Sequence, residues 1–119
     1  MKNLDHLNKL EEEGFAFICS RNDLTENIGK KFIVNDIEIA VFKIGPEVFA
    51  VSNICPHQQT RLIYDGFIED EFVVCPAHGW KFNLRTGKKD TGGNGLQVYS
   101  VEVIDDKVFI KIIPKEVKW

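Results

Sequence analysis

Cys55-Pro56-His57 and Cys75-Pro76-Ala77-His78 are the two stretches of sequence on which the interpretation of this chain depends. Each contains one cysteine and one histidine, and seventeen residues separate them. Thiolates and imidazoles are common ligands of zinc and iron. Because the whole chain has only three cysteines and three histidines, two such pairs predict a metal centre. The proline after each cysteine stiffens its loop and reduces the entropy lost when the ligands are fixed.

The order of the ligands distinguishes two kinds of metal centre. A Cys₂His₂ zinc finger pairs cysteine with cysteine and histidine with histidine, whereas each half here holds one of each. A [2Fe–2S] centre with two thiolates on one iron and two imidazoles on the other accommodates such mixed halves. The spacing therefore favours an iron–sulfur centre, and a zinc-binding interaction module without redox activity remains the alternative.

The pattern CPH…CPAHGWKFNLRTG, over residues 55–87, closely resembles the signature of Rieske [2Fe–2S] proteins. The resemblance implies that Cys55 and Cys75 bind a buried iron. It implies equally that His57 and His78 bind an outer iron near the surface. The fold expected from it is an antiparallel β-sandwich base that carries a small cluster-binding subdomain.

Departures from one branch of that family predict a low reduction potential. Rieske subunits of quinol-oxidising complexes cross-link the two loops by a disulfide, and Thr60 and Ala77 stand at the equivalent positions here. Those subunits also have a serine and a tyrosine where this chain has Trp80 and Phe82. Hydroxyl groups that donate hydrogen bonds to the cluster's sulfur atoms stabilise its reduced state. A chain without these donors is therefore expected to have a lower reduction potential. We expect a potential of roughly −150 to 0 mV, in the lower part of the Rieske range.

The remaining sequence predicts an all-β fold, because most of it consists of short runs rich in aromatic and β-branched residues. Strands are expected over residues 15–19, 31–34, 37–44, 48–52, 96–104 and 107–113. Asn35-Asp36 and Asp105-Asp106 separate successive runs and predict hairpin turns, and Pro114 ends the last run. Residues 53–95 hold six of the nine glycines and are expected to form a loop-rich segment on the β scaffold.

Length and composition indicate how the chain is organised. With 119 residues we expect one domain, comprising a short N-terminal helical extension over 1–14 and the cluster-binding subdomain over 53–95. The net charge of −3 gives no reason to expect nucleic acid. No apolar run approaches the roughly 18 residues of a membrane span. An odd cysteine count and a charged N-terminus favour the cytoplasm, and Cys19 is predicted to be a buried free thiol.

Residues around the second stretch have two interpretations each. Trp80 either contacts a redox partner or packs over the metal-binding loops. The second stretch is followed by a basic run, Lys81, Arg85, Lys88 and Lys89. This run either contacts an acidic surface of a partner or is a turn exposed to solvent. The glycine-rich segment Thr91–Gly95 stands where the family has a proline-bearing third loop.

The resemblance implies a one-electron carrier, a Rieske-type ferredoxin between an NAD(P)H-dependent flavin reductase and a terminal oxygenase or similar enzyme. It is not expected to be an enzyme by itself. A self-contained oxygenase needs a further iron held by two histidines and a carboxylate, and after His57 and His78 only His6 remains. The alternative is the small subunit of an assimilatory NAD(P)H nitrite reductase, whose large subunit is then the partner. Many such subunits lack cluster ligands, which favours the ferredoxin here.

Overall fold

The computed structural model describes residues 9–56, 59–77 and 79–113. Within these ranges strands predominate, and helical structure is confined to residues 9–12 and two 3-10 turns, η1 (Arg21–Asp23) and η2 (Ile63–Asp65). The strands are β1 (Phe15–Ser20), β2 (Lys30–Val34), β3 (Ile37–Ile44), β4 (Glu47–Ser52), β5 (Phe67–Glu69), β6 (Phe72–Val74), β7 (Lys81–Asn83), β8 (Val98–Tyr99), β9 (Val101–Ile104) and β10 (Lys107–Lys111). The all-β prediction is confirmed.

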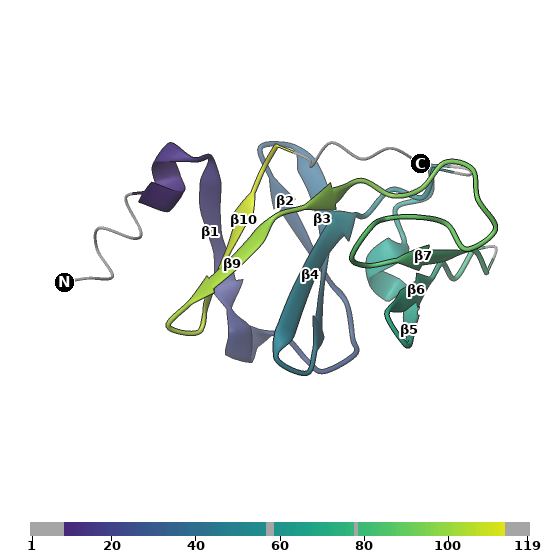
Figure 1. Cartoon of the computed structure of the whole chain (residues 1–119), viewed down its shortest axis with the longest axis horizontal. Helices are drawn as coiled ribbons and strands as arrows, with labels where there is room; N and C mark the ends of the chain where they lie inside the picture. Colours follow the sequence, from purple (N-terminus) through teal and green to yellow (C-terminus); the bar gives the residue numbers. More distant parts are fainter. Residues whose placement is uncertain (1–8, 57–58, 78, 114–119) are drawn as a thin grey trace.

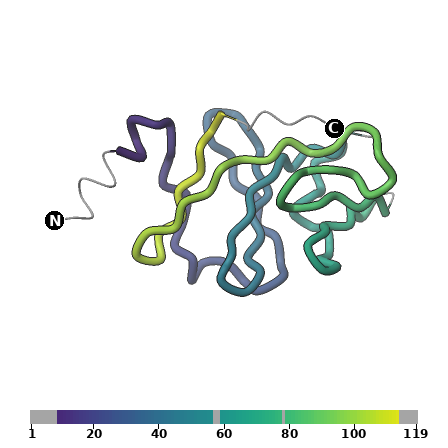
Figure 2. Tube along the Cα trace, in the orientation of Figure 1, coloured from purple at the N-terminus to yellow at the C-terminus, as the bar shows by residue number. Residues whose placement is uncertain are grey.

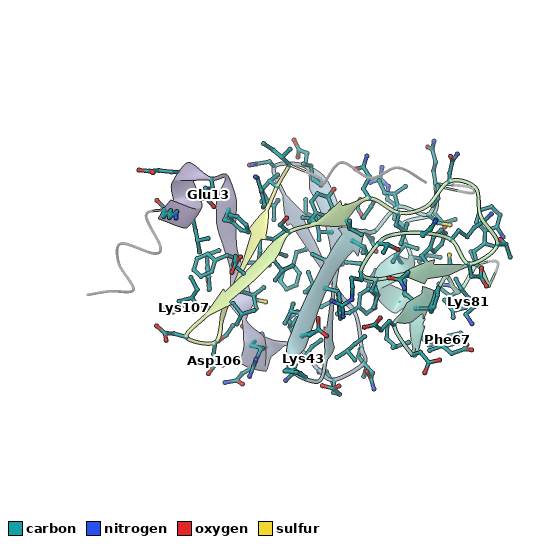
Figure 3. All side chains as sticks on the ribbon, viewed as in Figure 1. Glu13, Lys43, Phe67, Lys81, Asp106 and Lys107 are labelled. Atoms are coloured by element: carbon teal, nitrogen blue, oxygen red, sulfur yellow. The ribbon has the colours of Figure 1, made fainter. Side chains whose placement is uncertain are left out.

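The strands form three antiparallel sheets (Figure 1). A central sheet has the order β2-β3-β4-β8, a second sheet the order β1-β10-β9, and a small third sheet the order β5-β6-β7. The central and second sheets make a sandwich, and the third sheet lies at the other end of the molecule. In Figure 3 this end carries the labels of Phe67 and Lys81, whereas Asp106 and Lys107 mark the opposite end.

Strand β3, inside the central sheet, is buried on both faces. Alternate residues of β3 point to opposite sides, so Ile39 and Val41 enter one core while Ala40 and Phe42 enter another. All four are completely buried. We call the first the base core, which lies between the central and second sheets and includes Cys19, Leu24, Ala50, Tyr99, Val108 and Ile110.

The other core, called the cluster-side core, joins the central sheet to the third sheet. It includes Phe49, Val51, Cys55, Ile63, Val73, Cys75, Phe82, Leu84, Leu96 and Val98. Both cysteines of the predicted metal centre therefore belong to the same buried set, although nineteen residues of chain separate them.

Two hairpins have the predicted two-residue turns. Asn35 and Asp36, between β2 and β3, have φ angles of 50° and 66°. Asp105 and Asp106, between β9 and β10, have φ angles of 51° and 63°. Positive φ at both central residues is the geometry that matches the twist of a hairpin, and Asn and Asp tolerate it better than most residues.

One expectation about strands was wrong. Residues 96–104 do not form one strand, because β8 pairs with β4 in the central sheet and β9 pairs with β10 in the second. The chain changes sheets at Ser100, whose carbonyl accepts a bond from the Lys111 N–H (2.9 Å). Residues 53–95 contain strands β5, β6 and β7 as well as loops. At three residues each, these strands are too short to produce a clear alternation in the sequence.

The N-terminal helix is described only in part. Residues 9–12 are helical, and Leu10 is 5% exposed; Leu4 and Leu7 lie outside the described residues, as does Pro114. In the part of the chain that the structure describes, no helix is long and apolar enough to cross a membrane.

Two glycines with positive φ provide a test of the packing around the turn after β7. Gly87 (φ 77°) donates its N–H to the Asn83 carbonyl and accepts from the Leu96 N–H. A β-carbon on Gly87 would collide with the Leu96 carbonyl oxygen, whereas one on Gly45 (φ 56°) has no neighbour within 4 Å. Both alanine variants carry backbone strain at a positive φ, so the strain cancels in a comparison of the two. Gly87→Ala adds a collision and is therefore expected to lower the free energy of unfolding by about 1–3 kcal/mol more than Gly45→Ala. Urea unfolding of the two variants measures the difference; equal losses would contradict this packing.

Candidate metal centre

The two candidate thiol ligands are buried, and neither forms a disulfide. Cys55 is 1% exposed and lies three residues after β4; Cys75 is completely buried and directly follows β6. Each cysteine begins a short turn of chain, which we call the first loop (residues 55–60) and the second loop (residues 75–80).

The first loop is closed by two backbone hydrogen bonds on its cysteine. The Cys55 N–H donates to the Thr60 carbonyl (2.8 Å), and the Cys55 carbonyl accepts from the Gln59 N–H (2.8 Å). Gln59 adopts a φ of 55°, which turns the chain back toward the cysteine. This left-handed conformation is uncommon for a residue other than glycine.

The second loop has the same hydrogen-bond pattern. The Cys75 N–H donates to the Trp80 carbonyl (2.8 Å), and the Cys75 carbonyl accepts from the Gly79 N–H (2.9 Å). Gly79 has a φ of 72° and occupies the position that Gln59 occupies in the first loop. Two loops of unlike sequence thus hold their cysteines in matching backbone frames. That arrangement is suited to two thiolates that share one metal.

The predicted imidazole ligands, His57 and His78, lie outside the described residues, and their ligation remains a prediction. Among residues 9–56, 59–77 and 79–113, no three His, Cys, Asp or Glu side chains gather into a metal site. The four-residue set therefore depends on both histidines to complete it.

The surroundings of the loops fit a sulfur-rich iron centre. Two buried thiols on matched loops provide the soft ligands that iron–sulfur clusters require. The Thr60 Oγ1 atom is also buried, with no hydrogen-bond partner among the described residues. A cluster of this kind brings acceptor sulfur atoms into such a site, so the residues present fit the group.

A buried polar network fastens the first loop to the central sheet. Asn53, which is fully buried, donates from its side-chain amide to Glu38 (3.1 Å) and to the Arg61 carbonyl (3.1 Å). Its side-chain oxygen accepts from the Tyr64 N–H (2.8 Å). The Arg61 guanidinium pairs with the Glu38 carboxylate. The network connects β3 to the chain on both sides of the first loop.

The same network explains a charge inside the fold. Glu38 is only 9% exposed, and the hydrogen bond from Asn53, together with those of Arg61, lowers the pKa of its carboxyl below the usual value. We did not expect these residues from the sequence. The available signal was a glutamate at the buried start of an otherwise apolar strand, Ile37-Glu38-Ile39.

The predicted basic run is partly neutralised within the molecule. Arg85 forms ion pairs with Glu47 (2.9 Å) and Glu71 (2.7 Å). Lys81 pairs with Glu69 (3.1 Å). Arg85 thereby links β4 of the base to the turn between β5 and β6. Such half-exposed pairs stabilise the fold only weakly, but they reduce the net positive charge available to a partner.

Trp80 is half-buried and packs against the cluster-side core. Its ring lies 6.4 Å from the Phe82 ring, and the Lys89 Nζ stands 3.6 Å from the Trp80 ring centroid. This supports the packing interpretation for Trp80, and contact with a redox partner remains a prediction.

The glycine-rich segment Thr91–Gly95, called the third loop, lies opposite the first. Gly92 and Gly93 have φ angles of 85° and 90°. A groove of about 550 Å³ is lined by Pro56 and Gln59 on one side and by Asn94 and Gly95 on the other. Figure 2 shows the chain between β7 and β8 curving around the end of the molecule that holds the third sheet.

Cys19 takes no part in this site. It lies in the base core and is 6% exposed, and burial, with the nearby Asp23 charge, raises the pKa of its thiol. The prediction of a buried free thiol is confirmed.

Comparison with known proteins gives a consistent result. A family model for the Rieske-like [2Fe–2S] domain matches residues 14–111. The anthranilate 1,2-dioxygenase ferredoxin subunit of Burkholderia cepacia is 31% identical over 93 residues, which are 76% of this chain and 85% of that protein.

Solved structures share the fold. A chain in the complex of reduced oxygenase and oxidised ferredoxin in carbazole 1,9a-dioxygenase superposes with a TM-score of 0.77 at 24% identity, covering 87% of this chain and 98% of that one. The NAD(P)H nitrite reductase small subunit of Erwinia carotovora gives a TM-score of 0.71 at 25% identity, with 89% and 87% covered.

The Glu38 network predicts a pH-dependent contribution to stability. Folding lowers the pKa of the Glu38 carboxyl. The Glu38 charge therefore stabilises the fold at a pH above its pKa in the unfolded chain, about 4.3. This stabilisation is lost as the pH falls through the pKa in the folded protein. Wild type is therefore expected to be more stable than Glu38→Gln at pH 7, by a margin that shrinks toward pH 3. Urea unfolding at both pH values measures this, with Glu102→Gln on exposed β9 as the control. A margin independent of pH would contradict the role of the Glu38 charge.

Proposed function

This chain belongs to the family of Rieske-like [2Fe–2S] domains, and we propose that it is a ferredoxin of low potential that carries one electron at a time. Its cofactor is a Rieske-type [2Fe–2S] cluster. The observation that carries the proposal is the pair of matched loops, each of which holds a buried cysteine by the same two backbone hydrogen bonds.

The proposed ligand assignment is the one that the family resemblance implies, and the burial of both cysteines supports its cysteine half. Cys55 and Cys75 hold the inner iron, and His57 and His78 hold the outer iron. The cluster, when bound, supplies a centre that gains and loses a single electron. The protein's residues orient the thiolates and exclude water from them, since both cysteines sit in the cluster-side core. Residues 53–95 constitute the cluster-binding subdomain of a single domain, to which residues 1–14 add a helical extension.

The proposed partners are an NAD(P)H-dependent flavin reductase, as electron donor, and a terminal oxygenase, as acceptor. Support comes from the relative that is the ferredoxin subunit of anthranilate 1,2-dioxygenase. The chain is then a component of an oxidoreductase system, without catalytic turnover of its own. Because none of its three cysteines forms a disulfide, a reducing compartment, the cytoplasm, is the proposed location.

The small subunit of an NAD(P)H nitrite reductase is the second candidate. The fold shared with the Erwinia carotovora subunit supports it. The two candidates differ in the electron acceptor, a terminal oxygenase or a sirohaem-containing large subunit. Stopped-flow mixing of the reduced protein with each purified acceptor separates them, since only the true acceptor is expected to reoxidise it at a rate that saturates.

The proposed function predicts a one-electron redox couple of low potential. We expect a spectroscopic redox titration to follow a one-electron Nernst curve with a midpoint of roughly −150 to 0 mV. The physical reason is that Trp80, which ends the second loop, and Phe82, just after it, offer no hydroxyl donor to the cluster. A midpoint clearly above about +150 mV, well into the upper Rieske range, would contradict this expectation.

His78→Ala tests the ligand assignment. Loss of one imidazole from the outer iron is expected to abolish the Rieske EPR signal of the reduced protein. Circular dichroism is expected to retain the β signal of the base, because its core lies on the other face of the central sheet. His6→Ala, a histidine outside both loops, is the matched control. An unaltered EPR spectrum in His78→Ala would refute the assignment.

A further inference from the structure

Thr60 carries an unexplained polar atom. Its Oγ1 is the one buried side-chain nitrogen or oxygen among the described residues that has no hydrogen-bond partner. A buried hydroxyl without a partner costs about 1–3 kcal/mol, and native proteins keep few such groups. The other buried side-chain nitrogen and oxygen atoms of the described residues all have partners. We therefore expect the Thr60 hydroxyl to have a hydrogen-bond acceptor as well.

The location of Thr60 indicates where that acceptor lies. Thr60 closes the first loop, and its carbonyl accepts the N–H of Cys55 at 2.8 Å. The residue is therefore fastened to the cysteine that is proposed to hold the inner iron. In the sequences of the first loop and of the second loop with the two residues after it (55–60 and 75–82), Thr60 is also the only residue with a hydroxyl group.

We propose that the Thr60 hydroxyl donates a hydrogen bond to a sulfur atom of the bound cluster, the Cys55 thiolate included, and raises the reduction potential. The inference rests on the proposed function and adds a residue to it. Thiolate and sulfide sulfur atoms carry negative charge, and bonds to a charged acceptor are the stronger ones. Reduction adds one more negative charge, so the bond stabilises the reduced state more than the oxidised state.

The inference also refines the expectation of a low potential. Trp80 and Phe82 leave the second loop without hydroxyl donors, and Thr60 then supplies one donor from the first loop. One donor keeps the potential above that of a cluster with no hydroxyl donor at all.

Three variants test the inference. Thr60→Val keeps the branched shape and removes the hydroxyl, Thr60→Ser keeps the hydroxyl, and Thr25→Val makes the same chemical change at an exposed position of the base. The midpoint of Thr60→Val is expected to fall by about 59 mV, which corresponds to a tenfold change in the one-electron equilibrium. Thr60→Ser and Thr25→Val are expected to remain near the wild-type midpoint.

A second measurement reports the hydrogen bond directly. In resonance Raman spectra of the wild type, Fe–S bands are expected to shift when H₂O is replaced by D₂O, because the hydroxyl proton exchanges. Part of that shift is expected to disappear in Thr60→Val and to persist in Thr60→Ser. If Thr60→Val fails to assemble a cluster, Thr60→Ala takes its place in both measurements.

The outcomes separate this inference from the proposed function. A hydroxyl-free variant with two irons, a Rieske spectrum and the wild-type midpoint and isotope shift would overturn the role of Thr60 and leave the proposed function intact. A wild-type protein that binds no iron and sulfide would instead overturn the proposed function.

Discussion

Burial of β3, inside the central sheet, on both of its faces is the constraint on which the rest of the structure depends. Side chains of β3 alternate between two cores, so that Ile39 and Val41 join the base core while Ala40 and Phe42 join the cluster-side core. A strand segment buried on both faces has to be apolar unless its polar groups are paired, which explains the continuous run from Ile39 to Phe42 beside the paired Glu38. One sheet thus supports a self-contained sandwich and, on its other face, the core into which the loop cysteines are packed.

Each loop is anchored to this framework in its own way. The first loop is held by the buried side chain of Asn53, which contacts Glu38 of β3 and the chain that follows the loop. The second loop leaves β6 at Cys75 and returns to β7, so the third sheet itself holds it. Sites built on rigid elements keep their ligands in place, and an electron carrier benefits because its ligands need to move little when the charge changes.

How far the sequence predicted the structure depended on how local each feature is. The Asn35-Asp36 and Asp105-Asp106 turns were predictable, because turn conformation is specified within two to four residues. The change of sheet at Ser100 and the Asn53–Glu38 contact were not, because each depends on pairing between distant segments. The conformational match of the loops was hidden for another reason: Gln59 and Gly79 adopt the same left-handed conformation although their residue types differ.

The most direct test of the central claim, that the two matched loops hold a Rieske cluster, is the EPR spectrum of the reduced, purified protein with iron, zinc and sulfide analysis of the same sample. The account predicts two irons and two acid-labile sulfides per chain, with the EPR signal of a [2Fe–2S] centre ligated by two cysteines and two histidines. A colourless, EPR-silent protein that contains one zinc and no sulfide would contradict it.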